Sequence, residues 1–173
     1  AVANGLLTDY KVLVLTVNEE DIPQNLQAEI KMGLRTELNY DDTAKLIGVI
    51  NGLSKIIRGD EGRTWEADPC KMKRALAFCS AIGDVSKPGT SKNVSAIMPE
   101  ISKKYKEQIE NEDERKRVVD ISTKHIDGSM NSSERNEILS WLKEDGADGE
   151  CKIVTNVRCL SEGVDVPALD AVL

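Results

Sequence analysis

The sequence predicts an α/β domain with a mainly parallel sheet, and three observations support this. Short apolar runs alternate with segments whose apolar residues recur every three or four positions, as strands alternate with crossover helices. The chain of 173 residues has the usual size of one domain. Hydrophobic residues make up 40% and charged residues 31% of the chain, which is typical of folded globular proteins.

Several segments have the short, apolar character of strands that are buried on both faces. The four clearest are residues 10–17, 75–79, 151–155 and 170–173. A weaker fifth covers residues 117–122 and runs on to His125. These segments supply the strands of the predicted sheet.

The helix with the clearest pattern begins near Asp42 or Thr43, either of which can act as its N-cap. Its apolar residues recur at helical spacing and form one stripe: Leu46, Val49, Ile50, Leu53, Ile56 and Ile57. The turn-rich residues 58–63 follow. Trp65, beyond them, is interpreted as an anchor of that loop to the core, although its ring could also stack on a base.

Two further helices are expected in the second half of the chain. Asn131 and Glu134 have the spacing of a capping box, and Gly146 is placed to end the helix that they begin. Another helix is expected within residues 94–109. Pro99 should either break it or start it, because proline cannot donate the hydrogen bond of a helix interior.

The composition narrows the possible function classes. The net charge of -7 argues against a general electrostatic grip on nucleic acid, so any such contact must be local or shared with another domain. A zinc site is not expected, because His125 is the only histidine and the cysteines are far apart: Cys70, Cys79, Cys151 and Cys159. No apolar run is long enough to cross a bilayer and no signal peptide is recognised, which predicts a cytoplasmic protein.

No complete catalytic centre is recognised. A P-loop needs a Gly-Lys pair to bind phosphate and the chain contains none, so the Walker A half of an ATPase is absent. Asp113 and Glu114 imitate a Walker B motif, but no hydrophobic strand precedes them, and they are interpreted as a solvated charge cluster. His125 has no partner at a diagnostic spacing and is interpreted as a structural residue at a strand end.

The most specific motifs lie in residues 125–173. A strand end with the sequence His-Ile-Asp-Gly-Ser-Met is followed by Ser-Glu-Arg, an amphipathic helix and a second strand. Then comes Asn-Val-Arg-Cys-Leu-Ser-Glu-Gly-Val-Asp-Val-Pro, from Asn156 to Pro167. This order resembles the second RecA-like motor domain of superfamily 2 helicases. Residues 156–172 are most similar to motif V of helicase domains in bacterial restriction and defence systems, such as type ISP restriction enzymes.

The resemblance extends upstream, where residues 73–80 are similar to motif IV and residues 5–12 to the linker and first strand. It implies a three-layer RecA-like (P-loop NTPase-like) α/β domain over residues 1–173. This domain is expected to carry motifs IV and V, to lack Walker A, Walker B and motif VI, and to be incomplete at its C-terminal end.

The resemblance also implies where the site residues lie. A strand that ends near residue 155 delivers the following loop to the carboxyl edge of a parallel sheet, where such domains bind ligands. The residues expected to face ATP are Glu162, Gly163 and Asp165. Those expected to contact nucleic acid are Arg158, Asn156 and Thr155, and less closely matched are Ser80, Gly128 and Ser129. One departure is that Val157 occupies the position of the threonine in the DEAD-box form of the motif.

The implied function is one wall of the ATP cleft in a DNA helicase or translocase from a restriction-modification or phage-defence enzyme. ATP and Mg²⁺ would be held mainly by a first RecA-like domain, so this fragment alone is expected to be inactive and to bind no metal. The other expected partners are duplex DNA and nuclease and methyltransferase domains. Two alternatives stay open: a non-catalytic α/β binding or protein-interaction module, and a hydrolase that uses Glu162 and Asp165 as paired carboxylates.

Overall fold

The computed structural model describes residues 12, 14, 17–56, 70–158, 160 and 169–173. Four strands in this part of the chain form one parallel sheet in the order β2-β3-β1-β4. They are β1 (Arg74–Phe78), β2 (Asp120–Ile126), β3 (Glu150–Asn156) and β4 (Ala171–Val172). Strand β3 is buried from its second residue onward because it lies between β2 and β1. The predicted parallel sheet is confirmed.

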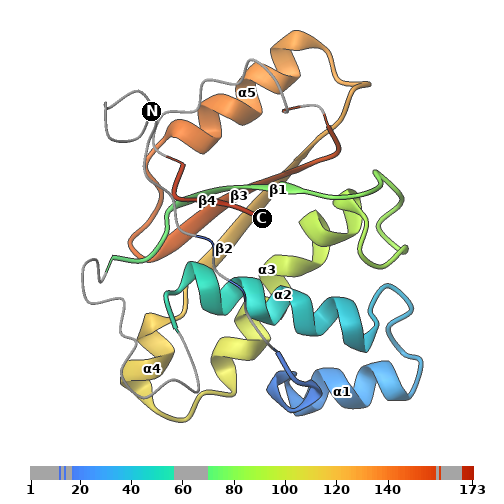
Figure 1. Ribbon diagram of the computed structural model, residues 1–173, viewed down its shortest axis with the longest axis vertical. Helices are drawn as coiled ribbons and strands as arrows, with labels where there is room; N and C mark the ends of the chain where they lie inside the picture. The colour runs from blue at the N-terminus through green and yellow to red at the C-terminus, as the bar shows by residue number, and fades with distance from the viewer. Residues whose placement is uncertain (1–11, 13, 15–16, 57–69, 159, 161–168) are drawn as a thin grey trace.

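Helices cover both faces of the sheet (Figure 1). The short helix η2 and the α-helices have these bounds: η2 (Glu19–Asp21), α1 (Gln24–Lys31), α2 (Tyr40–Leu53), α3 (Ser91–Glu107), α4 (Glu112–Arg117) and α5 (Ser132–Lys143). Helix α3 packs on one face with α2 behind it, and α5 packs on the other. The chain moves outward from β1 to β2 through α3 and returns to β3 through α5. Because such crossovers are right-handed, this reversal places the two helices on opposite faces.

Side chains of β1, β2 and β3 alternate between two apolar cores. On β3, Cys151 and Ile153 pack toward α2 and α3 in the larger core, whereas Val154 packs toward α5 in the smaller one. Leu142 of α5 is fully buried in that smaller core. The same alternation directs polar side chains at the strand ends to a defined face.

The strand predictions are confirmed for residues 75–79, 151–155 and 170–173, with bounds shifted by one residue or so. The weaker candidate is also a strand, but β2 begins at Asp120 rather than at residue 117. The expected strand at residues 10–17 lies mostly outside the described residues. Its described members Val12, Val14 and Val17 are not in a strand, and the first two are 79% and 86% exposed.

Helix α2 begins earlier than the sequence predicts. Its N-cap is Asn39, whose side-chain oxygen accepts a hydrogen bond from the backbone N–H of Asp42 at 2.7 Å. Neither predicted cap has that role, because Asp42 lies in the first turn and Thr43 is fully buried. The helix ends at Leu53, so the predicted apolar stripe is helical only up to that residue.

The predicted capping box of α5 is confirmed. The Asn131 side chain accepts from the N–H of Glu134, and the Glu134 carboxylate accepts from the N–H of Asn131, both at 2.9 Å. The helix ends at Lys143, before Gly146. Residues 58–63 and Trp65 lie outside the described residues.

Helix α3 runs unbroken through Pro99, so the predicted break or start at this proline is wrong. Proline has no N–H, and this leaves the carbonyl oxygen of Ser95, four residues earlier, without its helical partner. The hydroxyl of Thr123, on β2, donates a hydrogen bond to that oxygen. A neighbouring strand thus supplies the bond that the helix cannot make.

We expect Thr123→Val to lower the free energy of unfolding by about 1 kcal/mol, because the Ser95 carbonyl loses its donor. In a Pro99→Ala background the helix can make its own bond to Ser95, so the same substitution should cost less. Denaturant unfolding of the wild type, the two single variants and the double variant measures both costs. An equal cost in the two backgrounds would contradict the role given to Thr123.

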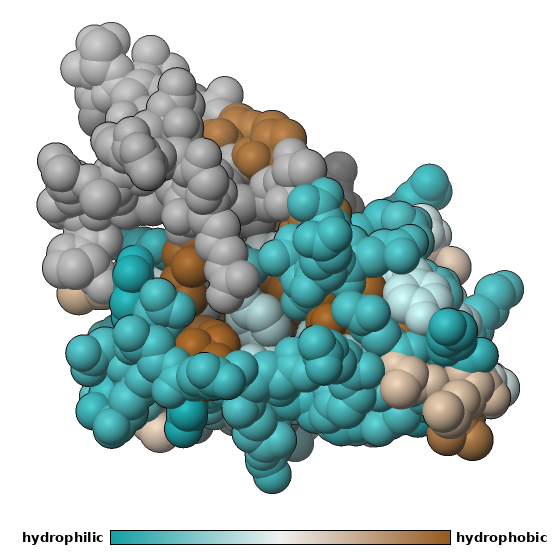
Figure 2. Space-filling model, turned by 90° about the horizontal axis from the view of Figure 1, so that it is seen from below, coloured by the Kyte–Doolittle hydropathy of each residue, from teal (hydrophilic) through white to brown (hydrophobic). Residues whose placement is uncertain are grey.

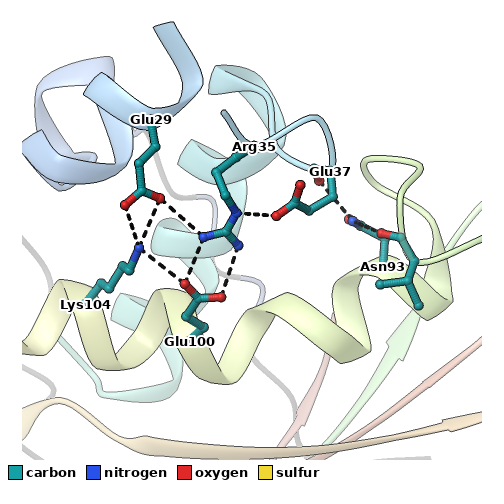
Figure 3. A network of polar contacts seen from close by, with 7 residues as sticks. Glu29, Arg35, Glu37, Asn93, Glu100 and Lys104 are labelled. Atoms are coloured by element: carbon teal, nitrogen blue, oxygen red, sulfur yellow. Dashed lines mark hydrogen bonds and ion pairs between the residues drawn. The ribbon is translucent and has the colours of Figure 1, made fainter. Parts of the chain in front are cut away.

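An ion-pair network joins α1 and the turn after it to α3 (Figure 3). Arg35 pairs with Glu29, Glu37 and Glu100, and Lys104 bridges Glu29 at 3.0 Å and Glu100 at 3.2 Å. The hydrogen bonds from Arg35 hold the pKa of Glu100 below its ordinary value. Because these side chains are only partly buried, each ion pair alone adds little to the free energy of unfolding. The pairs act as a network that links α1 to α3.

The surface seen from the side of α1 and α4 is mostly hydrophilic, with apolar atoms in small separate patches (Figure 2). No helix within the described ranges is long and apolar enough to cross a membrane.

Candidate functional site

Three parallel strands end side by side. Asn156, at the end of β3, is the register partner both of Phe78 at the end of β1 and of Ile126 at the end of β2. The loops that leave these strand ends therefore share one edge of the sheet. Because open α/β sheets bind ligands outside the carboxyl ends of their strands, this edge is the candidate functional site.

At this edge, side chains from two strands meet the first residue of α3. His125 and Thr155 are register partners on β2 and β3, and both contact Ser91. Nδ1 of His125 lies 2.8 Å from Oγ of Ser91 and 3.4 Å from Oγ1 of Thr155. The Thr155 hydroxyl donates to the backbone oxygen of Ser91 at 3.0 Å. The start of α3 is thus bonded to both strands.

The other side of the imidazole meets a buried carboxylate. Nε2 of His125 lies 3.2 Å from Oδ2 of Asp127, which is only 5% exposed. The backbone N–H of Ser129 donates to Oδ1 of Asp127 at 2.9 Å, and its hydroxyl donates to the same oxygen. The Lys92 ammonium lies 3.5 Å from Oδ2. The Ser129 bonds above all, then His125, hold the pKa of Asp127 well below its usual range, so the group is ionised.

The ionised carboxylate places a hydrogen on one nitrogen of the ring. A carboxylate only accepts hydrogen bonds, so Nε2 of His125 donates to Asp127, and in the neutral form of the ring Nδ1 is then the acceptor for the Ser91 hydroxyl. The order Ser91, His125, Asp127 imitates a nucleophilic triad. However, Ser91 is completely buried, so its oxygen is not available to attack a substrate. The contacts support the interpretation of His125 as a structural residue.

Sequence reasoning singled out His125, Thr155 and Ser129 in this cluster but missed Ser91, Asp127 and Lys92. The hydrogen bond between Ser91 and His125 joins residues 34 positions apart, and no spacing rule points to it. The separation of two residues between His125 and Asp127 is also uninformative, because strand residues at that spacing occur in every sheet.

A fully buried asparagine holds the loop between β1 and α3. The Asn93 amide donates to the backbone oxygens of Val85 at 2.7 Å and of Glu37 at 2.9 Å. Its side-chain oxygen accepts from the N–H of Gly89 at 3.1 Å. The loop that carries Ser80 is therefore tied both to α3 and to the turn before α2, as Figure 3 shows for Asn93 and Glu37.

The sequence-predicted nucleic-acid residues fall into two groups. Thr155 and Asn156 are fully buried, with their side chains bonded to the backbone oxygens of Ser91 and Ala77. Oδ1 of Asn156 has no hydrogen-bond donor among the described residues. The exposed group consists of Ser80, Gly128, Ser129 and Arg158.

Two of the exposed residues have constrained geometry. Arg158, two residues beyond β3, has a backbone φ of 59°, a left-handed conformation that is uncommon outside glycine. Both donors of Ser129 bond to Asp127. The predicted ATP-cleft residues Glu162, Gly163 and Asp165 lie outside the described residues, as does Cys159. In the ranges that the structure describes, no group of three His, Cys, Asp or Glu side chains is placed to hold a metal ion.

Comparison with known proteins gives two matches. Residues 89–173 match the helicase conserved C-terminal domain family. The whole fold resembles a region of the ATP-dependent type ISP restriction-modification enzyme LlaBIII, in a structure bound to DNA. The TM-score is 0.73 and the identity 33%, over 99% of this chain and 10% of the longer one. No curated protein sequence matches the chain significantly.

The two matches agree with the geometry at the sheet edge. The four-stranded parallel sheet with helices on both faces has the RecA-like fold that the sequence predicts, and the family match includes β2, β3 and the loops that follow them. The chain spans 10% of the length of the type ISP enzyme that it resembles. Residues 89–173 therefore carry the helicase conserved C-terminal domain, and the fold agrees with the second RecA-like domain of a superfamily 2 helicase.

Proposed function

We propose that the chain forms one wall of the interdomain ATP cleft in the motor of a DNA helicase or translocase. The motor would belong to a restriction-modification or phage-defence enzyme. The observation that carries this proposal is the 33% identity over 99% of the chain to part of an ATP-dependent type ISP enzyme bound to DNA. Since that part is a small share of the longer protein, the activity belongs to the whole protein and this chain alone is expected to be inactive.

In this proposal the nucleotide is shared between two domains. ATP and Mg²⁺ are held mainly by a first RecA-like domain of the same protein, because this chain has no Gly-Lys pair to bind phosphates. Glu162, Gly163 and Asp165 face the nucleotide from the second side, where Asp165 can accept a hydrogen bond from a ribose hydroxyl. Nuclease and methyltransferase domains are further partners in the same protein.

The exposed residues at the carboxyl edge are proposed to contact duplex DNA. Arg158 leaves the end of β3 toward solvent, where its guanidinium can donate to a phosphate. Thr155 and Asn156 are buried, so their part in this proposal is to hold the end of β3 against α3 and β1. With a net charge of -7, the chain offers only a local grip, and the rest of the DNA surface must come from other domains.

DNA-stimulated ATPase activity of the full-length protein tests the proposal. We expect Arg158→Ala to raise the KM for DNA about tenfold, because a charge-assisted phosphate contact is lost. Arg158→Lys should recover part of this loss, since lysine keeps the charge but not the planar fork. Asp165→Ala should instead raise the KM for ATP.

The control for folding is circular dichroism of each variant. If the wild type shows no DNA-stimulated ATPase activity, the motor proposal fails and a non-catalytic binding or protein-interaction module takes its place. If the activity is present but none of the three variants alters it, the proposed contacts are wrong while the motor itself stands.

A further inference from the structure

Two loop ends and one strand of the carboxyl edge meet at the His125 imidazole. His125 contacts Ser91, which ends the loop from β1, and Asp127, which begins the loop from β2. It also lies beside Thr155, the penultimate residue of β3. The imidazole is mostly shielded, with 11% of its side chain exposed.

The exposed residues that are proposed to contact DNA lie on the loops that these bonds connect. Ser80 is on the loop that ends at Ser91, and Gly128 and Ser129 are on the loop that begins at Asp127. Asp127 is buried and accepts both donors of Ser129, so the orientation of its carboxylate sets the position of Ser129. Because the His125 ring is bonded both to Asp127 and to Ser91, it sets the position of the β2–α5 loop relative to the β1–α3 loop.

We infer that His125 is a positioning residue for the DNA contact. It fixes the position of the β1–α3 loop relative to the β2–α5 loop, so that both loops can contact the same DNA strand. This inference rests on the proposed function. It goes beyond that function because His125 itself touches no DNA and no nucleotide.

The two bonds use polar atoms on opposite sides of a rigid frame. Neutral histidine provides this, with Nδ1 accepting from Ser91 and Nε2 donating to Asp127. Glutamine can reach Asp127 with its amide but lacks the acceptor beside Ser91. Asparagine places its amide beside Ser91 and does not reach Asp127. The two substitutions therefore separate the two bonds.

The experiment measures the KM for DNA and the kcat of DNA-stimulated ATP hydrolysis in the full-length protein. We expect His125→Phe, which removes both bonds, to raise the KM for DNA about tenfold, equivalent to one or two lost hydrogen bonds. The kcat at saturating DNA should change by less than about twofold, because saturating DNA selects the positioned loops. His125→Gln should recover most of the affinity, because it keeps the bond to the carboxylate that positions Ser129. His125→Asn loses that bond and should recover little.

Thr123→Val is the matched control. Thr123 lies on the same strand and face, two residues earlier, and bonds α3 through Ser95 without contacting either loop. We expect this variant to be less stable but to keep the wild-type KM for DNA. An equal rise in the KM for Thr123→Val and His125→Phe would overturn the inference, since general loosening of α3 would then explain both.

Other outcomes are equally decisive. An unchanged KM in His125→Phe overturns the inference, as does an equal rise in the Gln and Asn variants. If His125→Phe fails to fold, the comparison of Gln with Asn decides alone. Failure of the inference differs from failure of the proposed function, because in the first case Arg158→Ala still raises the KM for DNA, whereas in the second the wild type shows no stimulation.

Discussion

Lys152→Met is expected to lower the free energy of unfolding by about 2 kcal/mol, because it removes the donor to two backbone oxygens at the end of α5. The Lys152 side chain crosses from β3 to this helix and is 6% exposed. Its ammonium donates to the backbone oxygens of Trp141 at 3.0 Å and of Glu144 at 3.1 Å. Trp141 lies in the last turn and Glu144 is the C-cap residue, so neither carbonyl has a helical partner, and both lie at the negative end of the helix dipole. Methionine fills a similar volume but leaves both oxygens unpaired.

Lys124→Met is the matched control. The ammonium groups of Lys124 and Lys152 lie 4.8 Å and 5.2 Å from the centre of the Trp141 ring, so both lysines make the same kind of cation–π contact. Of these two lysines, only Lys152 donates to backbone oxygens at the end of α5 in the described structure. We expect Lys124→Met to cost less than about 1 kcal/mol. Similar losses for both variants in urea unfolding would show that the ring contact, and not the helix end, carries the stability.

Asp127→Asn is expected to lower the free energy of unfolding at neutral pH by about 2 kcal/mol. It should also make that free energy less dependent on pH in the acidic range. The folded protein holds the pKa of Asp127 below the ordinary value of 3.8, first through the bonds from Ser129. A carboxyl with a lowered pKa stabilises the fold above the ordinary value, and this contribution disappears as the pH falls through the lower, folded value. The wild type should thus lose stability below about pH 4, and the variant should lose less of it there.

Asp84 gives a close control for this prediction. It accepts the same pair of local bonds, from the backbone N–H and the hydroxyl of Ser86, both at 3.0 Å, and its pKa is also lowered. Asp84 is exposed, however, and has no histidine against its second oxygen. The free energy of unfolding, measured from acid to neutral pH, should therefore depart from that of the wild type far more in Asp127→Asn than in Asp84→Asn. Matching curves would mean that the local turn alone explains the effect.

Sequence patterns predicted what depends on neighbours along the chain. The strands near residues 75 and 151 and the capping box at Asn131 are local features, and all three are present. Helix α3 was misjudged at Pro99 because its missing bond comes from another element, through Thr123.

The candidate site shows the same division. Motif spacing placed Arg158 beyond the end of a strand, where the structure has it, and it gave no indication that Thr155 and Asn156 are buried. Nor did it indicate that Ser91 and His125 meet, because that contact depends on the register between α3 and β2. Bonds between elements that are distant in sequence are set by the fold, and single-chain periodicity does not contain them.

The order of the strands has a consequence for how the domain can be divided. The family match begins at residue 89, yet β1 ends at Phe78 and lies between β3 and β4 in the sheet. A chain shortened to residues 89–173 would lose β1, the strand that joins β3 to β4 in the sheet. It would also lose Arg74, which donates to the carbonyls at the end of α5. The residues that match the family are therefore fewer than the residues that must fold together. The cooperative folding unit begins at β1 or earlier in the chain.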